Sequence, residues 1–301
     1  MVAMLSDKIA LVTGASRGVG RGVALELGRQ GAYVIGAART ARADETRQWG
    51  ADGPTVPGSL DETIAQIVAA GGGAEAVPTD LADVDQIESL VCRVIDRHGR
   101  IDMIANCAMG FPQSFEGVFW DTPLEDWPRQ VDVGVRAKYL IARFAAPHMV
   151  RQGGGLIVNI SSAASKDDFY NVAYRTAMAA VDRMTSAMAA DLRPYGVAVV
   201  SIWPRWVRTE RVLIAARDPQ PGFPVTEEDL AASDTPEFTG RAIAHLACDP
   251  DILSRSGKIF PVVQLSHLYG FPDIDGVQPA MDDYTASWAR RLAAIDDALG
   301  S

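Results

Sequence analysis

The chain has 301 residues, which is enough for one large α/β domain built around a single core. Its composition, 48% hydrophobic and 22% charged residues, is ordinary for a globular protein. The net charge of −10 argues against non-specific binding to nucleic acid or to an anionic membrane, because both need a basic face.

The three cysteines, Cys92, Cys107 and Cys248, show neither metal-ligand nor redox-motif spacing, and the four histidines are scattered. We therefore expect no metal site and a reducing, cytoplasmic setting. Charge appears before any long apolar run at the start of the sequence, so no secretory signal is expected. No stretch of 18 apolar residues occurs, so no membrane span is expected either.

Short apolar runs alternate with amphipathic segments along most of the chain. Near-continuous runs rich in Val, Ile, Leu and Ala predict strands buried on both faces at 8–14, 32–38, 74–80, 101–108, 155–162 and 197–204, with a short seventh at 257–263. Helix-like stretches lie between them at 20–31, 60–72, 81–99, 124–151 and 170–192. This alternation predicts an α/β fold: a doubly wound, Rossmann-type, mostly parallel seven-stranded sheet with helices on both faces.

Three regions interrupt the alternation. Residues 40–58 are rich in Gly, Pro and charge and predict a long loop inserted after the second strand. Residues 214–238 and those beyond 264 look irregular, and the tail ends in a predicted helix at 281–299. No linker divides the chain, so we expect one domain over 1–301, with a lid over the substrate at about 207–235 and a C-terminal extension at about 264–301.

The stretch LVTGASRGVGRG follows the first strand directly and opens a helix. Gly14, Gly18 and Gly20 permit a tight turn and a close backbone approach to a pyrophosphate, and the helix N-terminus beyond them offers free N–H groups. A plain glycine turn is the alternative. The order strand, turn and helix within one βαβ unit favours a dinucleotide site.

The spacing T-G-x-x-x-G-x-G resembles the short-chain dehydrogenase/reductase family, classical type. Further motifs agree between residues 5 and 210: PTDLAD, ANCAM in place of N-N-A-G, NISS, then Tyr174, and WPRWVRT in place of P-G-x-V-x-T. Cys107 and Met109 depart from N-N-A-G, and Arg205 replaces a glycine. The tail SGKIFPVVQLSHLYGFPDIDG is similar to that of the branch of dehydrogenase/reductase family member one. In that branch a glycine replaces the asparagine of the catalytic tetrad, and Gly134 stands at this position here.

The cofactor that the resemblance implies is a nicotinamide dinucleotide, and charge favours NADP(H). An NAD enzyme needs an acid after the second strand, but Ala38 stands there, followed by Arg39, and Arg17 lies in the glycine turn. Two guanidiniums suit a 2′-phosphate, although both could be ordinary surface arginines. The residues expected to bind the cofactor are Thr13, Gly14, Ser16, Arg17, Gly18, Val19, Gly20, Arg39, Asp80, Leu81, Asn106, Ala108, Tyr174, Pro204, Val207 and Thr209.

The catalytic residue that the resemblance implies is Tyr174, which would exchange a proton with the substrate oxygen. A phenol has a pKa of about 10, so the family uses a lysine four residues later to lower it. Met178 occupies that position here. Because residues i and i+4 share a helix face, a thioether should lie where the ammonium belongs, and the phenol should be less acidic than in relatives.

Another cation could compensate for the missing lysine. Lys138, Lys166 and Arg175 are candidates, and Arg205, just after the sixth strand, is the one that we favour as a catalytic residue. Arg205 could equally point to solvent. The expected serine, which would hydrogen-bond the substrate oxygen, is Ser162 by its place after the strand or Ser161 by its distance from Tyr174.

We expect an NADP(H)-dependent oxidoreductase that interconverts a small-molecule carbonyl and an alcohol, without a nucleic-acid or membrane partner. A binding protein that holds NADP(H) with little turnover is the alternative, and Met178 favours it. A non-redox enzyme using Lys166 or Arg205 is a third hypothesis. The resemblance further implies a homodimer or homotetramer formed through the long helices at about 124–151 and 170–192.

Overall fold

The computed structural model describes residues 4–45, 47–49, 53–112, 118–166, 170–220 and 223–281. Within them a seven-stranded sheet has the order β5-β2-β1-β6-β7-β8-β9, and every neighbouring pair is parallel. The predicted doubly wound sheet is therefore confirmed. The strands are β1 (Ile9–Thr13), β2 (Tyr33–Ala38), β5 (Ala74–Pro78), β6 (Met103–Asn106), β7 (Gly155–Ile160), β8 (Val197–Trp203) and β9 (Ile259–Pro261).

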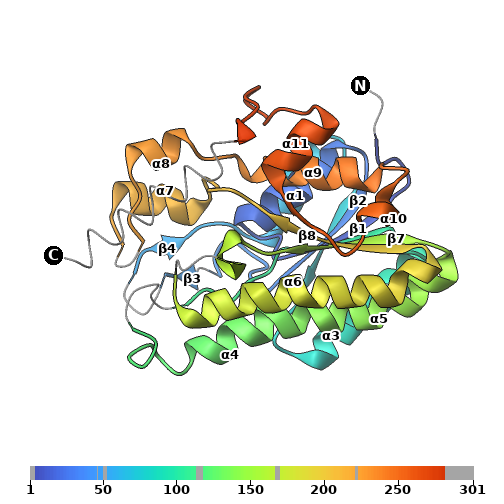
Figure 1. Cartoon of the computed structure of the whole chain (residues 1–301), viewed down its shortest axis with the longest axis horizontal. Coiled ribbons are helices and arrows are strands. Elements are labelled where there is room, and N and C mark those ends of the chain that lie inside the picture. Colours follow the sequence, from blue (N-terminus) through green and yellow to red (C-terminus); the bar gives the residue numbers. More distant parts are fainter. Residues whose placement is uncertain are drawn as a thin grey trace.

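Helices cover both faces of the sheet (Figure 1). One face carries α1 (Gly18–Arg29), α2 (Leu60–Ala69), α9 (Pro236–Ala247) and α11 (Val262–Tyr269), and the short α10 (Ile252–Arg255) lies beside β8. The other carries α3 (Val84–His98), α4 (Asp126–Val131), α5 (Ala137–Gln152) and α6 (Val172–Leu192). Side-chain N-caps mark the starts of two of these helices. The Asp83 side chain accepts from the Gln86 N–H at the start of α3, and the Asn171 side chain accepts from the Tyr174 N–H at the start of α6.

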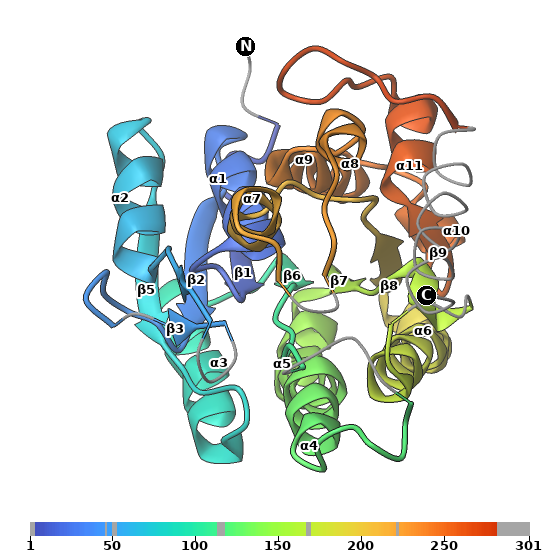
Figure 2. The ribbon, with the colours of Figure 1, turned by 90° about the vertical axis from the view of Figure 1, so that its left-hand side faces the viewer.

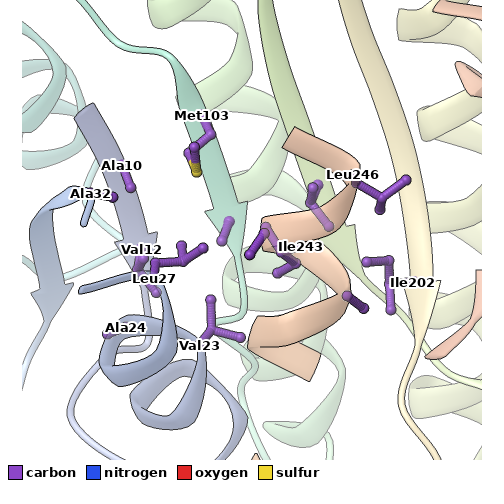
Figure 3. Packing of buried hydrophobic residues seen from close by; sticks show 14 of the residues in the cluster. Ala10, Val12, Val23, Ala24, Leu27, Ala32, Met103, Ile202, Ile243 and Leu246 are labelled. Atoms are coloured by element: carbon purple, nitrogen blue, oxygen red, sulfur yellow. The ribbon is translucent and has the colours of Figure 1, made fainter. Parts of the chain in front are cut away.

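Each face of the sheet has its own apolar core, because every central strand is buried on both sides. On one face Val23 and Leu27 of α1 lie beside Val12 of β1, and Leu246 of α9 lies toward Ile202 of β8 (Figure 3). The residues that α3, α5 and α6 bury on the other face are Ile87, Leu90, Val91, Val94, Ile141, Ala142, Ala145, Met149 and Ala189. The strands are thereby held rigidly, with their carboxyl ends at one edge.

Glycines allow α1 and α9 to cross at close range. A Cβ placed on Gly22 would lie 2.3 Å from the carbonyl carbon of Pro236, and one on Gly240 would lie 2.6 Å from the Glu26 Cβ. The Glu26 carboxylate, buried at this crossing, is bound by Arg29 at 2.6 Å. α1, and with it the glycine turn before it, is thus fixed against α9, which lies more than 200 residues later in the sequence.

The regions predicted to be irregular contain more regular structure than expected. Within 40–58, β3 (Arg47–Gln48) and β4 (Thr55–Val56) form an antiparallel pair. Residues 214–238 hold the end of α7 (Glu210–Arg217), α8 (Glu227–Ala231) and the start of α9. The sequence did carry signals for these helices, because Thr226 and Asp229 form a capping box and Pro236 stands in the first turn of α9.

Two further predictions differ from the structure or lie beyond it. The last strand ends at Pro261 and α11 begins at Val262, so part of the predicted strand at 257–263 and of the supposedly irregular tail is helical. The helix predicted at 281–299 lies, after Met281, outside the described residues. The long helix predicted at 124–151 is continuous but contains a π-helical segment, Asp132–Arg136, between α4 and α5.

Candidate active site

A pocket of about 730 Å³ lies at the carboxyl edge of the sheet. The segments that follow β1, β2, β5, β6, β7 and β8 all line it, as expected when parallel strands end at one edge. Figure 2 faces this end of the molecule, with α7 in front of α1. The predicted site residues that line the pocket are Gly14, Ser16, Arg17, Gly18, Val19, Gly20, Arg39, Asp80, Leu81, Ala108, Ser161, Ser162, Tyr174, Pro204, Arg205, Val207 and Thr209.

The glycine turn is tightly built. Gly14 and Gly18 have φ values of +69° and +57°, a region that side chains disfavour. A Cβ on Gly20 would lie 2.3 Å from the Gly14 carbonyl oxygen. The glycines therefore add no side chains of their own between the N-terminus of α1 and the pocket. One donor at this N-terminus already meets an anion, because the Gly18 N–H donates to Glu210 Oε2 at 2.7 Å.

Two predicted cofactor residues, Thr13 and Asn106, are buried behind the pocket rather than in its wall. Thr13 Oγ1 accepts from the Ala108 N–H at 3.3 Å, and Asn106 Nδ2 donates to Asn159 Oδ1 at 3.0 Å. Thr13 thus holds Ala108 of the loop after β6 in the pocket wall, and Asn106 joins the end of β6 to β7.

The pocket wall beyond β2 carries cations and no acid directly after the strand. Ala38 is buried, and the exposed Arg39 lines the pocket. Arg17 Nη2 donates to the Gly58 carbonyl at 2.7 Å and to Thr40 Oγ1 at 3.3 Å, which ties the glycine turn to the inserted segment. At the neighbouring strand end, Asp80 Oδ1 accepts from the Ala82 N–H at 3.0 Å.

At the other end of the pocket, the Tyr174 side chain is hydrogen-bonded to Ser162. The ring of Tyr170 meets that of Tyr174 edge-on, with centroids 5.3 Å apart. Burial and the neighbouring Tyr170 raise the pKa of the Tyr174 phenol above its ordinary value, while the Ser162 hydrogen bond lowers it. Ser161 is occupied elsewhere, since its Oγ donates to the Met178 carbonyl at 3.1 Å. Ser162 is therefore the serine beside the phenol.

Met178 belongs to an apolar cluster beneath Tyr174. It is 3% exposed and packs with Ala163, Ala177 and Trp203, and with Met109 at the cluster's edge. Met109 in turn depends on Gly134, because a Cβ at 134 would lie 2.7 Å from the Met109 Sδ. The departures from the family pattern at 109, 134 and 178 are thus one packing arrangement, in which thioethers take space that polar side chains would otherwise use.

The two candidate compensating lysines make their contacts with groups other than the phenol. Lys138 Nζ donates to the Ala108 carbonyl at 2.6 Å, and burial lowers its pKa to about 8. Lys166 is exposed over the Trp203 ring, and neither lysine lines the pocket. Arg175 does not line it either.

Arg205 does line the pocket, but it forms a buried ion pair. Its Nη2 lies 2.9 Å from Asp234 Oδ1 and donates to the Ala232 carbonyl at 2.8 Å. Its Nη1 has no hydrogen-bond partner among the described residues. Arg205 therefore does not point to solvent, and most of its charge is balanced by a carboxylate from the segment before α9.

Sequence reasoning missed several residues of the pocket, among them Tyr170, Glu210, Arg211 and Phe111. Arg211 lies over the rings of Phe111 and of Trp49, which belongs to the inserted segment. Tyr170 could have been noticed four residues before Tyr174, although it precedes Asn171, the N-cap of α6. The contact of Trp49 with Arg211 could not, because it joins the inserted segment to α7 across the pocket, and no sequence spacing encodes it.

Fold and site together define a doubly wound α/β protein whose pocket lies at the carboxyl ends of the strands, where such folds bind nucleotides. The model of the short chain dehydrogenase family matches residues 55–218. Dehydrogenase/reductase SDR family member 1 of Mus musculus is 35% identical over 298 residues, which cover 96% of this chain and 90% of that protein. The chain therefore belongs to the short-chain dehydrogenase/reductase family, whose members are oxidoreductases that bind a nicotinamide cofactor and act on small molecules.

Solved structures agree with this assignment. A short-chain dehydrogenase/reductase from Burkholderia xenovorans has a TM-score of 0.70 and 25% identity, covering 89% of this chain and 98% of its own. A metagenomic short-chain oxidoreductase in complex with NADP has a TM-score of 0.66 and 28% identity, covering 86% and 98%. Among the described residues no helix is both long and apolar enough to cross a membrane, and no cluster of metal-binding side chains occurs.

Proposed function

We propose that the chain is an NADP(H)-dependent oxidoreductase that interconverts a carbonyl and an alcohol, with Tyr174 as its acid and base. The observation that carries this proposal is that one pocket joins the glycine turn to the hydrogen-bonded pair Tyr174 and Ser162. In doubly wound folds a dinucleotide lies across the crevice at the carboxyl ends of the strands, with its phosphates at the glycine turn and its reactive ring further along the pocket. The segment at about 207–235 would serve as a lid over the substrate, within a single domain.

The cofactor would supply or accept the hydride, and this chain's residues would hold it. The N–H groups at the start of α1 suit its pyrophosphate. Arg17 and Arg39 line the pocket after β2, where a 2′-phosphate would lie, and the absence of a carboxylate at Ala38 favours NADP(H) over NAD(H).

Tyr174 would donate its phenolic proton to the oxygen of the reduced carbonyl, which Ser162 would orient by a hydrogen bond. The raised pKa of the phenol keeps it protonated at neutral pH. A protonated phenol can act as the acid of reduction, whereas alcohol oxidation needs the phenolate. The site therefore favours the carbonyl-reducing direction.

Arg205 would act as a positioning residue rather than as a replacement for the missing lysine. It joins the strand end after β8 to Asp234, whose backbone N–H donates to the Trp206 carbonyl at 2.8 Å. Burial raises the pKa of Asp234 to about 6, while the pairing with Arg205 lowers it, so the carboxylate is still ionised at neutral pH. The pair would hold the base of the lid.

A second candidate function is a binding protein that holds NADP(H) with little turnover. Met178 favours it, because no ammonium lies beside the phenol in the described part of the chain and burial makes the phenol a weaker acid. The two candidates make different predictions for hydride transfer but the same prediction for cofactor binding.

The test has two arms. NADPH and NADH fluorescence titrations should show binding with NADPH preferred, and single-turnover oxidation of NADPH over a panel of ketones and aldehydes should identify a substrate. Tyr174→Phe should then lower the single-turnover rate at saturating NADPH by about 10²–10⁴. Binding without any oxidation would favour the binding protein, and absence of binding would refute both candidates.

We further propose a homodimer or homotetramer formed through α4–α5 and α6. The outward face of α6 exposes three alanines, Ala179, Ala187 and Ala190, which would let a second helix approach closely beside the exposed Arg183. Free Cys92, Cys107 and Cys248 support the proposal of a reducing, cytoplasmic setting.

A further inference from the structure

The first turn of α7 lies directly on the glycine turn. Glu210 Oε2 accepts from the Gly18 N–H at 2.7 Å, and Glu210 Oε1 lies 3.4 Å from Arg21 Nη1. A Cβ on Gly18 would lie 3.5 Å from the Thr209 methyl group. α7 therefore begins against the N-terminus of α1, with a carboxylate on a donor that a phosphate would also use.

Arg211, the next residue, is held between two aromatic rings. Its guanidinium carbon lies 5.1 Å from the ring centroid of Trp49 and 4.7 Å from that of Phe111. Stacking on ring faces fixes the guanidinium plane without using its N–H donors. Within the described part of the chain, Arg211 forms neither a hydrogen bond nor an ion pair, and it lines the same pocket as Gly14, Ser16 and Gly18.

The surroundings of Arg211 disfavour the positive charge of its guanidinium. Burial and the nearby guanidinium of Arg17 lower the pKa of Arg211 to about 10, although Glu210 raises it. Arg211 is still charged at neutral pH. A dianionic group between the glycine turn and α7 would be stabilised by Arg211 and would relieve its repulsion with Arg17.

We propose that Arg211 binds the pyrophosphate of the dinucleotide from the α7 side, and that this pyrophosphate replaces the Glu210 carboxylate on the Gly18 N–H. The inference rests on the proposed function. Two anions cannot share one N–H donor without strong repulsion, so Glu210 competes with the phosphate, whereas the planar fork of Arg211 matches it. Adjacent residues of one helical turn should thus have opposite effects on cofactor binding.

The experiment measures dissociation constants for NADPH and NADH by nicotinamide fluorescence, and for adenosine 2′-phosphate by calorimetry. Arg211→Gln should weaken NADPH and NADH equally, by about 10–100-fold, because it removes charge-assisted hydrogen bonds. It should leave adenosine 2′-phosphate, which has no pyrophosphate, unchanged. Glu210→Gln, the matched control one residue away, should tighten binding of both dinucleotides.

Arg211→Lys provides a second variant in case Arg211→Gln does not fold. It keeps the charge but loses the fork and the stacking, so an intermediate loss is expected. The inference is overturned if Arg211→Gln binds both dinucleotides as the parent does, if its loss is confined to NADPH and adenosine 2′-phosphate, or if Glu210→Gln weakens binding too. Failure of the parent protein to bind either dinucleotide would instead refute the proposed function.

Discussion

Met178 adds an apolar side chain to the cluster below Tyr174, at the position where the family resemblance implies a lysine. Its neighbour Met109 occupies space that is open only because residue 134 is glycine. The residues at positions 109, 134 and 178 therefore fit one another as a set. Restoring a single polar residue tests the chemistry but also disturbs this packing.

Met178→Lys should change the pH dependence of alcohol oxidation. In the parent, the phenolate is the base and the phenol pKa is raised, so the rate should rise about 10-fold per pH unit through pH 10 without a plateau. An ammonium at 178 lowers the phenol pKa, so the variant should reach its plateau at lower pH and be at least about 10-fold faster at pH 7.

Met178→Lys should also destabilise the protein. It should lower the free energy of unfolding by about 1–3 kcal/mol, because it buries an ammonium among apolar side chains. Met178→Leu is the control: it should fold like the parent and keep the rising profile. A Met178→Lys profile that overlies that of the parent would contradict the role assigned to this position.

Among the elements, the crossing of α1 and α9 determines where the glycine turn lies. Gly22 has no room for a methyl group, whose carbon would lie 2.3 Å from the Pro236 carbonyl carbon. Backbone, unlike a flexible side chain, cannot move aside without shifting the whole helix.

Gly22→Ala should therefore lower the free energy of unfolding by about 1–3 kcal/mol, measured by urea denaturation. Gly154→Ala is a matched control, because the nearest atom to its new Cβ, the Gly196 carbonyl oxygen, is 3.4 Å away. Gly22→Ala should also weaken cofactor binding, since α1 presents the pocket's N–H groups. Equal free energies of unfolding for Gly22→Ala and Gly154→Ala would contradict the tight packing of α1 against α9.

The strands and the glycine turn could be predicted from sequence because they depend on local signals: buried apolar runs and glycine spacing. The serine at the site could be narrowed only to Ser161 or Ser162, since a one-residue change in loop length decides which one turns toward Tyr174. The contacts of α7 could not be predicted at all. They join Glu210 to Gly18 and Arg211 to Trp49, residues far apart in the chain that only tertiary packing brings together.

For the molecule as a whole, the sheet, the inserted β3–β4 pair and α7 converge on a single pocket. Trp49 of the insertion packs with Trp206 and with Phe223 of the 214–238 segment, so two of the three segments that interrupt the α/β alternation support each other beside the site. The chain has a net charge of −10, but its pocket is lined by three arginines, Arg17, Arg39 and Arg211. A local positive field in an acidic protein suits a phosphorylated ligand.

The most direct test of the account is a crystal structure of the protein with bound NADP⁺. We expect the pyrophosphate at the start of α1, the nicotinamide ring beside the hydroxyl of Tyr174, and the Glu210 carboxylate displaced from the Gly18 N–H. A nicotinamide ring bound away from Tyr174, or a cofactor that leaves the glycine turn unused, would contradict it.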